Sequence, residues 1–201
     1  MTNFVVPEYV DGDHARNFIP VTYWHLPMLR IFLPRTDSEG VVRRWSFFLP
    51  KGADLKAATS WTEIATTSSV SEVQSCTAGA SAKGEVDTDL IDALVGAIGP
   101  RVLTFAGWNG YADHLQGRTT RLRGDVYRIM EADLDSLRAS VRLPEFAWDA
   151  SGEFAWGGRL YPDSIVVAAE KSIFRTLMSD ATIDAVAVRA DRDVLPLSAN
   201  D

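Results

Sequence analysis

The sequence is poor in the residues on which most disulfide, metal and acid–base chemistry depends. Its 201 residues include one cysteine, Cys76, and three histidines, His14, His25 and His114. A single cysteine excludes an internal disulfide framework and a paired-cysteine metal knuckle. Three histidines leave little scope for a transition-metal site or for a catalytic base at neutral pH. We therefore expect a protein of a reducing compartment that carries no metal or other cofactor.

Long apolar runs and a basic leader are absent as well. Nowhere do about 18 uncharged apolar residues follow one another, and the first residues hold no basic segment ahead of an apolar stretch. Both absences predict a cytoplasmic protein that does not enter a membrane. The length and the 46% hydrophobic content are those of one folded domain.

Signature motifs for phosphate binding and for serine hydrolases are also missing. The chain has no GxxxxGK[ST] loop, no GxGxxG turn and no GxSxG elbow. Its net charge of -7 repels phosphate backbones and favours a basic partner, so we expect no nucleic acid and a protein partner with a basic patch. The basic cluster Arg118, Arg121, Arg123 and Arg128 is interpreted as a solvated strand surface.

The first half of the chain predicts a hairpin, a loop and a helix. Residues 24–34 form an apolar run typical of a buried strand, and residues 41–50 follow a short turn and are predicted to pair with it. Residues 66–88 are small and polar, which predicts an exposed, flexible loop. Residues 89–98 have apolar side chains at helical spacing, with capping candidates before them and Gly99 after them.

The second half predicts further strands and two short helices. The expected elements are a strand at 101–108, two strand-like runs within 119–131, a short helix at 132–140, an aromatic-rich loop at 145–162, and a strand, helix and alternating segment within 163–189. Taken together, the pattern predicts a single α+β domain over residues 1–201. We expect a mostly antiparallel sheet with two or three helices packed on one face.

The stretch FAGWNGYADH, residues 105–114, concentrates the chemically versatile side chains. We interpret it as a strand that ends in a turn, and its candidate binding residues are Trp108, Asn109, Tyr111, Asp113 and His114. In one interpretation the turn presents Trp108 and Tyr111 to a partner. In the other, both rings only pack the turn onto the core, and the sequence leaves the two open.

Two further tryptophans, Trp148 and Trp156, lie beside glycines or acids and are expected to be partly exposed. Exposed aromatics next to carboxylates are typical of protein-binding surfaces. Since no catalytic residue is assembled by any motif, the leading hypothesis is a non-catalytic protein-binding module. An immunity or antitoxin-like partner that neutralises a cognate bacterial protein would fit.

Two alternatives stay open. The first is a small hydrolase or transferase that uses His114 with Asp113 or Asn109. The second is a small-ligand carrier in which the aromatic loop around Trp148 and Trp156 acts as a lid. The carboxylate pair Glu145 and Asp149 could perform acid–base work in a cleft, although solvated loops explain it more simply.

The order of four segments resembles a family of uncharacterised proteins frequent in actinobacterial genomes. The matching pieces, mainly within residues 89–195, are LTFAGWNGYAD, RLRGDVYRIMEADL, LPEFAWDASGEFAW and SIVVAAEKSIFRTLMSDATIDAVAVRADRDV. The chain departs from that pattern at Ala168, Ala169 and Glu170, where a glycine pair and a serine are expected. The resemblance implies a one-domain organisation and contributes no catalytic residue.

Overall fold

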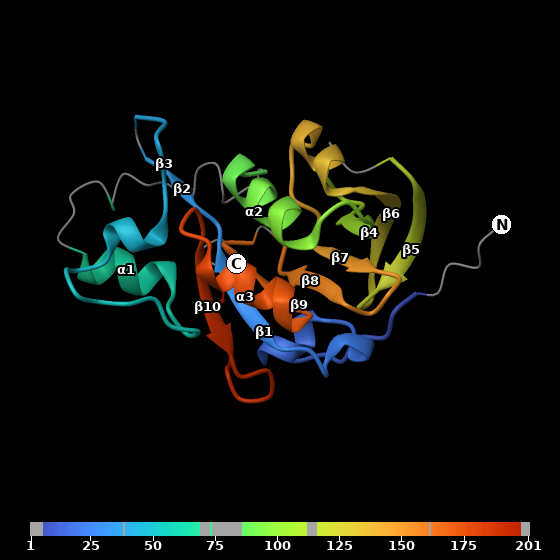
Figure 1. Cartoon of the computed structure of the whole chain (residues 1–201), viewed down its shortest axis with the longest axis horizontal. Helices are drawn as coiled ribbons and strands as arrows, with labels where there is room; N and C mark the ends of the chain where they lie inside the picture. The colour runs from blue at the N-terminus through green and yellow to red at the C-terminus, as the bar shows by residue number, and fades with distance from the viewer. Residues whose placement is uncertain are drawn as a thin grey trace.

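An eight-stranded sheet, antiparallel at every pairing, forms the centre of the molecule (Figure 1). The computed structural model describes residues 6–37, 39–68, 73, 86–111, 116–160 and 162–197. The strands are β1 (Met28–Phe32), β4 (Val102–Trp108), β5 (Arg118–Leu122), β6 (Asp125–Asp133), β7 (Phe146–Asp149), β8 (Phe154–Gly158), β9 (Ser164–Ala169) and β10 (Asp184–Val188). Their spatial order is β10-β1-β9-β8-β7-β4-β6-β5.

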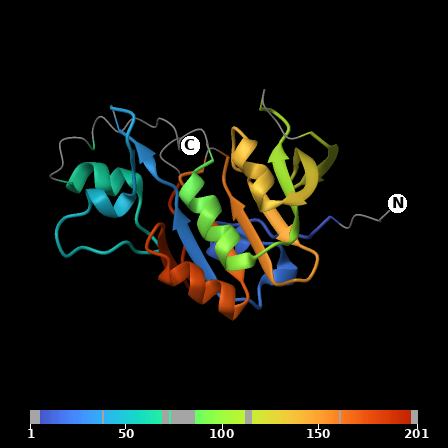
Figure 2. The ribbon, with the colours of Figure 1, turned by 45° about the horizontal axis from the view of Figure 1, so that its top comes forward.

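Helices cover one face of this sheet and the N-terminal segment covers the other. On the first face lie α2 (Thr88–Ile98), α3 (Lys171–Ser179) and the 3-10 helix η6 (Leu134–Ala139), as Figure 2 shows. On the second face lie the 3-10 helices η1 (Ala15–Phe18) and η2 (Val21–Tyr23). Because both faces are covered, β8 is buried along its whole length. The α+β class, the antiparallel sheet and the helices on one face are confirmed.

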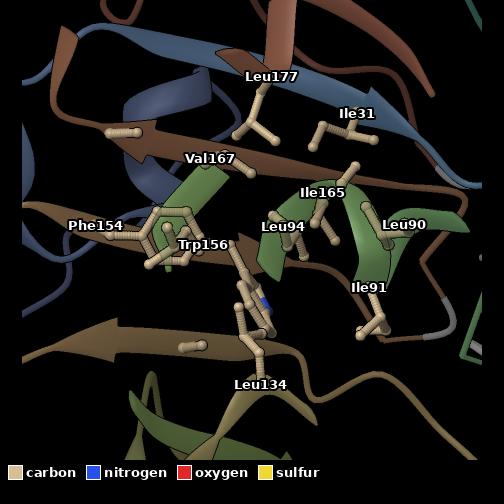
Figure 3. Close-up of a cluster of buried hydrophobic side chains, with 14 of the residues drawn as sticks. Ile31, Leu90, Ile91, Leu94, Leu134, Phe154, Trp156, Ile165, Val167 and Leu177 are labelled. Atoms are coloured by element: carbon tan, nitrogen blue, oxygen red, sulfur yellow. The ribbon is translucent and has the colours of Figure 1, made fainter. Parts of the chain in front are cut away.

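The largest core cluster fills the space between the sheet and the helices. It joins Leu94 of α2, Leu177 of α3 and Trp156 of β8 in one cluster (Figure 3). Helix α2 begins where predicted, because the Asp87 carboxylate accepts a hydrogen bond from the Leu90 backbone N–H at 3.2 Å. It ends at Gly99, whose φ of 70° closes the last turn.

A smaller core lies beside the sheet, around α1 (Trp61–Thr67) and the 3-10 helix η3 (Trp45–Phe48). Two fully buried arginines border it. Arg30 donates to the carbonyls of Ala57 and Thr59 at 2.8 and 2.7 Å, and burial lowers the pKa of its guanidinium to about 10. Both Arg30 and Arg35 form ion pairs with Asp163, at 3.7 and 3.8 Å.

The predicted hairpin between residues 24–34 and 41–50 is wrong. Strand β1 pairs with β9 and β10 instead. The short strand β3 (Val42–Arg43) pairs with β2 (Arg35–Thr36), which lies beyond the end of the predicted first strand. Trp45 and Phe48 are three residues apart, so a 3-10 helix places both on one side and buries them together. An extended strand would have pointed them to opposite faces.

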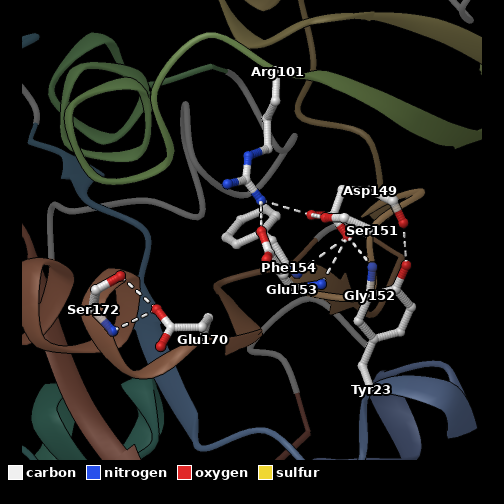
Figure 4. Close-up of polar contacts among 9 residues, drawn as sticks. All are labelled: Tyr23, Arg101, Asp149, Ser151, Gly152, Glu153, Phe154, Glu170 and Ser172. Atoms are coloured by element: carbon white, nitrogen blue, oxygen red, sulfur yellow. Dashed lines mark hydrogen bonds and ion pairs between the residues drawn. The ribbon is translucent and has the colours of Figure 1, made fainter.

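The predicted aromatic-rich loop at 145–162 is a hairpin of β7 and β8. Its turn is organised by the buried Asp149 carboxylate, which accepts from the Ser151 hydroxyl at 2.6 Å and from three backbone N–H groups at 2.9 to 3.3 Å (Figure 4). Arg101 pairs with the same carboxylate at 2.7 Å, and Tyr23 donates to the Asp149 carbonyl oxygen. The interpretation of Asp149 as a solvated loop acid is therefore wrong.

Two other expectations concern loops and membranes. The loop predicted at 66–88 lies mostly outside the described residues. Its first positions complete α1 and its last position begins α2. Within the described ranges, no helix has the length and apolar character needed to cross a bilayer.

Candidate functional site

Three residues of the FAGWNGYADH stretch, Gly107, Trp108 and Tyr111, build one wall of a cavity. Residues 105–108 complete β4, and the turn that follows is fixed by the adjacent strand, because Asn109 donates its backbone N–H to the Val126 carbonyl at 3.0 Å and accepts from Arg128 at 2.8 Å. The Trp108 indole folds back over Gly110. A Cβ atom at position 110 would lie 2.2 Å from the ring, so glycine is required for this placement.

The rings of Trp108 and Tyr111 form the aromatic part of this wall. Their centroids are 5.2 Å apart and the rings are nearly perpendicular, at 83°. Such edge-to-face pairs stabilise each other beyond the area they bury. The Arg142 guanidinium lies 4.5 Å from the Tyr111 ring centroid, within the range of a cation–π contact.

The cavity between this turn and the segment 136–145 has a volume of about 310 Å³. We call it the Trp108 pocket. Besides the aromatic pair, its walls include the apolar side chains of Met130, Val141 and Leu143. Its volume is at the lower end of the range of small-molecule sites, and its mostly apolar lining is typical of them.

The pocket opens where the β4–β7 ladder ends. In the register of this pair, Ala106 lies opposite Phe146, so Trp108 would next face Pro144. Proline has no backbone N–H and cannot continue the ladder as a donor. The Glu145 side chain takes the role that a carbonyl of the neighbouring strand would have, since its Oε2 accepts the Trp108 backbone N–H at 2.8 Å.

Glu145 is almost completely buried at this point, with 1% of its surface exposed. Burial raises the pKa of its carboxyl, while hydrogen bonds from the Trp108 backbone and the Tyr111 side chain, and the charge of Arg142, act in the opposite direction. The carboxyl thus joins the end of β4, the aromatic turn and the start of β7. It holds the pocket in shape.

The predicted site residues are brought together only in part. Trp108 and Tyr111 line the pocket, and Asn109 supports the turn through Arg128. Asp113 and His114 lie outside the described residues, so the predicted role of His114 in catalysis stays a prediction.

The expected exposure of Trp148 and Trp156 is wrong. They are 7% and 0% exposed, and the Trp156 indole N–H donates to the Pro144 carbonyl at 2.9 Å. The glycine after Trp156 is explained by close packing, and it does not form a turn. A Cβ atom on Gly157 would lie 1.8 Å from the Phe18 carbonyl oxygen.

Sequence reasoning missed the opposite wall of the pocket. Arg142 and Leu143 were assigned no role, and Glu145 was considered only as half of a carboxylate pair with Asp149, for acid–base work in a cleft or, more simply, as a solvated loop acid. One signal was available. Glu145 lies in LPEFA, where its neighbours are a proline and apolar residues, and an apolar run of this kind indicates a buried segment.

Neither metal ligands among the described residues nor comparisons with known proteins add information about this site. In the described part of the chain, no three histidine, cysteine, aspartate or glutamate side chains lie close enough together to hold a metal ion. No protein-family model, curated protein or solved structure matches this chain. The function is therefore argued from the geometry of the pocket.

Proposed function

We propose that the protein is a non-catalytic binding protein that receives an apolar side chain of a partner protein in the Trp108 pocket. The observation that carries this proposal is the pocket itself, with its perpendicular Trp108–Tyr111 pair, its apolar walls and its buried, hydrogen-bonded Glu145. Tryptophan and tyrosine rings offer large contact areas at a small cost in side-chain entropy.

The size of the pocket fits one anchoring side chain. Burial of a Leu, Phe or Met side chain contributes about 1.5–3 kcal/mol. Specific protein interfaces bury about 1,600 Å² in total, so the surface around the pocket would contribute the rest of the contact. The net charge of -7 favours a basic partner at long range.

A binding role is favoured over a catalytic one by the state of Glu145. Its carboxylate is turned toward donors of its own chain, and only 1% of the residue is exposed. A general acid or base needs to reach the group whose proton it transfers. A partner that neutralises a cognate protein, as immunity proteins do, requires only a shaped and rigid surface.

The proposal is tested by filling the pocket. Peptides would be selected from a display library on the wild-type protein, and their affinities measured for Ala139→Leu and Ala150→Leu. Ala139 lines the pocket and Ala150 lies in the β7–β8 turn, both exposed, so the two substitutions are matched. We expect peptides that share an apolar or aromatic residue and bind Ala139→Leu at least about tenfold more weakly, a loss of about 1.4 kcal/mol. Equal binding to wild type and both variants would exclude the pocket.

A small-ligand carrier is the second candidate, because a volume of about 310 Å³ also admits a small molecule. Denaturation of protein purified from its own host, followed by mass spectrometry, would reveal such a ligand. A molecule retained by wild type and lost by Ala139→Leu would favour the carrier. No described feature favours the hydrolase alternative.

A further inference from the structure

A second hollow, of about 710 Å³, shares no lining residue with the Trp108 pocket and is lined by residues of β3, η3 and the start of α2. Two of the apolar side chains that line it are exposed. Val42 is 58% exposed and Phe47 is 50% exposed. We call this area the Phe47 surface, made up of Val42, Arg43, Arg44, Phe47, Asp87 and Asp89.

Phe47 is held in place although it faces solvent. Its ring packs edge-on against the buried Phe48, with centroids 5.1 Å apart, and the Arg43 guanidinium lies 4.8 Å from its centroid. Among the described residues, Phe47 is the only aromatic side chain in the exposed class. An exposed aromatic ring next to an arginine and a valine has the composition of an interface centre.

The charges of the Phe47 surface are segregated. One side carries Arg43 and Arg44, next to Phe47 in the chain, and the other carries Asp87 and Asp89 at the start of α2. Arg43 is paired with Asp37 at 3.3 Å, and Arg44 donates to the Ala181 carbonyl, so both guanidinium groups are positioned. Asp87 caps α2, and Asp89 is exposed.

We propose that the Phe47 surface is the interface of a twofold dimer, and that its occupant is a second copy of this chain. In a twofold interface the same patch meets itself, so each side of one copy faces the opposite side of the other. The arginines of each copy then meet the aspartates of its partner, with the two Phe47 rings at the centre. A surface with charge of one sign would repel its own copy.

Sedimentation velocity of the full chain over a concentration series tests the dimer. We expect the wild type to dimerise, and Phe47→Ser, Arg44→Glu and Asp89→Arg each to weaken association about tenfold or more. Val102→Ser, which replaces an exposed valine at the start of β4, is the control and should leave association unchanged. Circular dichroism would confirm that each variant is folded.

A mixture of two variants distinguishes a second copy from any other occupant. In a dimer of either variant alone, the residues at positions 44 and 89 that meet across the twofold interface carry like charges. In a mixed dimer, the introduced glutamate of one copy faces the introduced arginine of the other, and the native Asp89 faces the native Arg44. The mixture should therefore regain dimerisation that neither variant shows alone. A monomeric wild type at all concentrations would overturn the proposal, as would a dimer insensitive to the substitutions or folded variants whose mixture stays monomeric.

Discussion

Three segments of the chain look alike in sequence, and one of them differs from the other two in structure. FAGW at 105–108 and the pair FAW at 146–148 and FAW at 154–156 all begin with Phe-Ala and end in tryptophan. The three phenylalanines are all buried. The tryptophans differ, because Trp148 and Trp156 are buried within the sheet while Trp108 is partly exposed and lines a pocket.

The difference comes from position in the sheet. Strands β7 and β8 each have a neighbour on both sides, and both faces above them are covered. Trp108 is the last residue of β4, past the point where β7 pairs with that strand. It retains β6 on one side and a glutamate side chain on the other. The same residue type is therefore core in one place and surface in the other.

The largest expected effect comes from removing the central tryptophan. Trp156→Ala should lower the free energy of unfolding by about 3–5 kcal/mol, because it leaves a cavity in a packed core and frees the Pro144 carbonyl. Urea denaturation followed by circular dichroism measures this loss. An effect below about 1 kcal/mol would contradict the packing of β8.

The hairpin turn should be the next most sensitive element. Asp149→Ala leaves the Ser151 hydroxyl and three backbone N–H groups without their acceptor, and we expect a loss of about 1–3 kcal/mol. Asp135→Ala removes an exposed carboxylate and serves as the control, with an expected loss within about 0–1 kcal/mol. Similar losses in the two variants would show that the turn does not depend on Asp149.

Trp108 should matter more for binding than for stability. Trp108→Ala should lower the free energy of unfolding by less than Trp156→Ala does, because its ring is partly exposed. It should also abolish binding of the peptides selected on the pocket. Measuring both by denaturation and by fluorescence polarisation separates the two roles. A loss of stability as large as that of Trp156→Ala would make Trp108 a core residue.

Gly110→Ala should disturb the pocket without removing any side chain. A methyl group at this position lies 2.2 Å from the Trp108 ring, so the ring must move. Gly96→Ala in α2 is the matched control. Nothing lies within 4 Å of the added methyl there, and the substitution should stabilise the helix by about 0.5–1 kcal/mol. Unchanged peptide affinity in Gly110→Ala would show that the ring position is not needed.

The smallest effect concerns pH. The pKa of Glu145 is raised, so the folded protein binds this proton more tightly than the unfolded chain. Its contribution to stability is therefore fully present below the unfolded pKa, about 4.3, and is lost as pH rises from that value through the folded pKa. Glu145→Gln should remove this component. The wild-type minus variant difference in free energy of unfolding should fall with rising pH, and a flat or rising difference would contradict it.

The sequence predicted the elements with strong local signals. Asp87 and Gly99 marked the ends of α2 correctly, and the antiparallel α+β organisation followed from the spacing of turns. The pairing of strands that are distant in the chain could not be predicted. Strand β1 pairs with segments more than a hundred residues away, and local patterns carry no information on that pairing.

The sequence predicted no pocket at this place, but it identified two of the residues that line it. Trp108 and Tyr111 were identified because they lie within four residues of each other. Glu145 was not, since its partner Trp108 lies 37 residues earlier in the chain. The glycines after Trp156 were interpreted as a turn signal, whereas Gly157 permits close packing against the Phe18 backbone. Local composition did not distinguish these two uses of glycine.

The most direct test of the Trp108 pocket is a titration with p-cresol and indole, which stand in for tyrosine and tryptophan side chains. The six tryptophan indole N–H signals would be followed by two-dimensional NMR. We predict that the Trp108 signal shifts with saturation, that the Trp45 and Trp156 signals do not, and that Ala139→Leu removes the shift. A Trp108 signal that stays in place, or that shifts equally in Ala139→Leu, would contradict binding in the pocket.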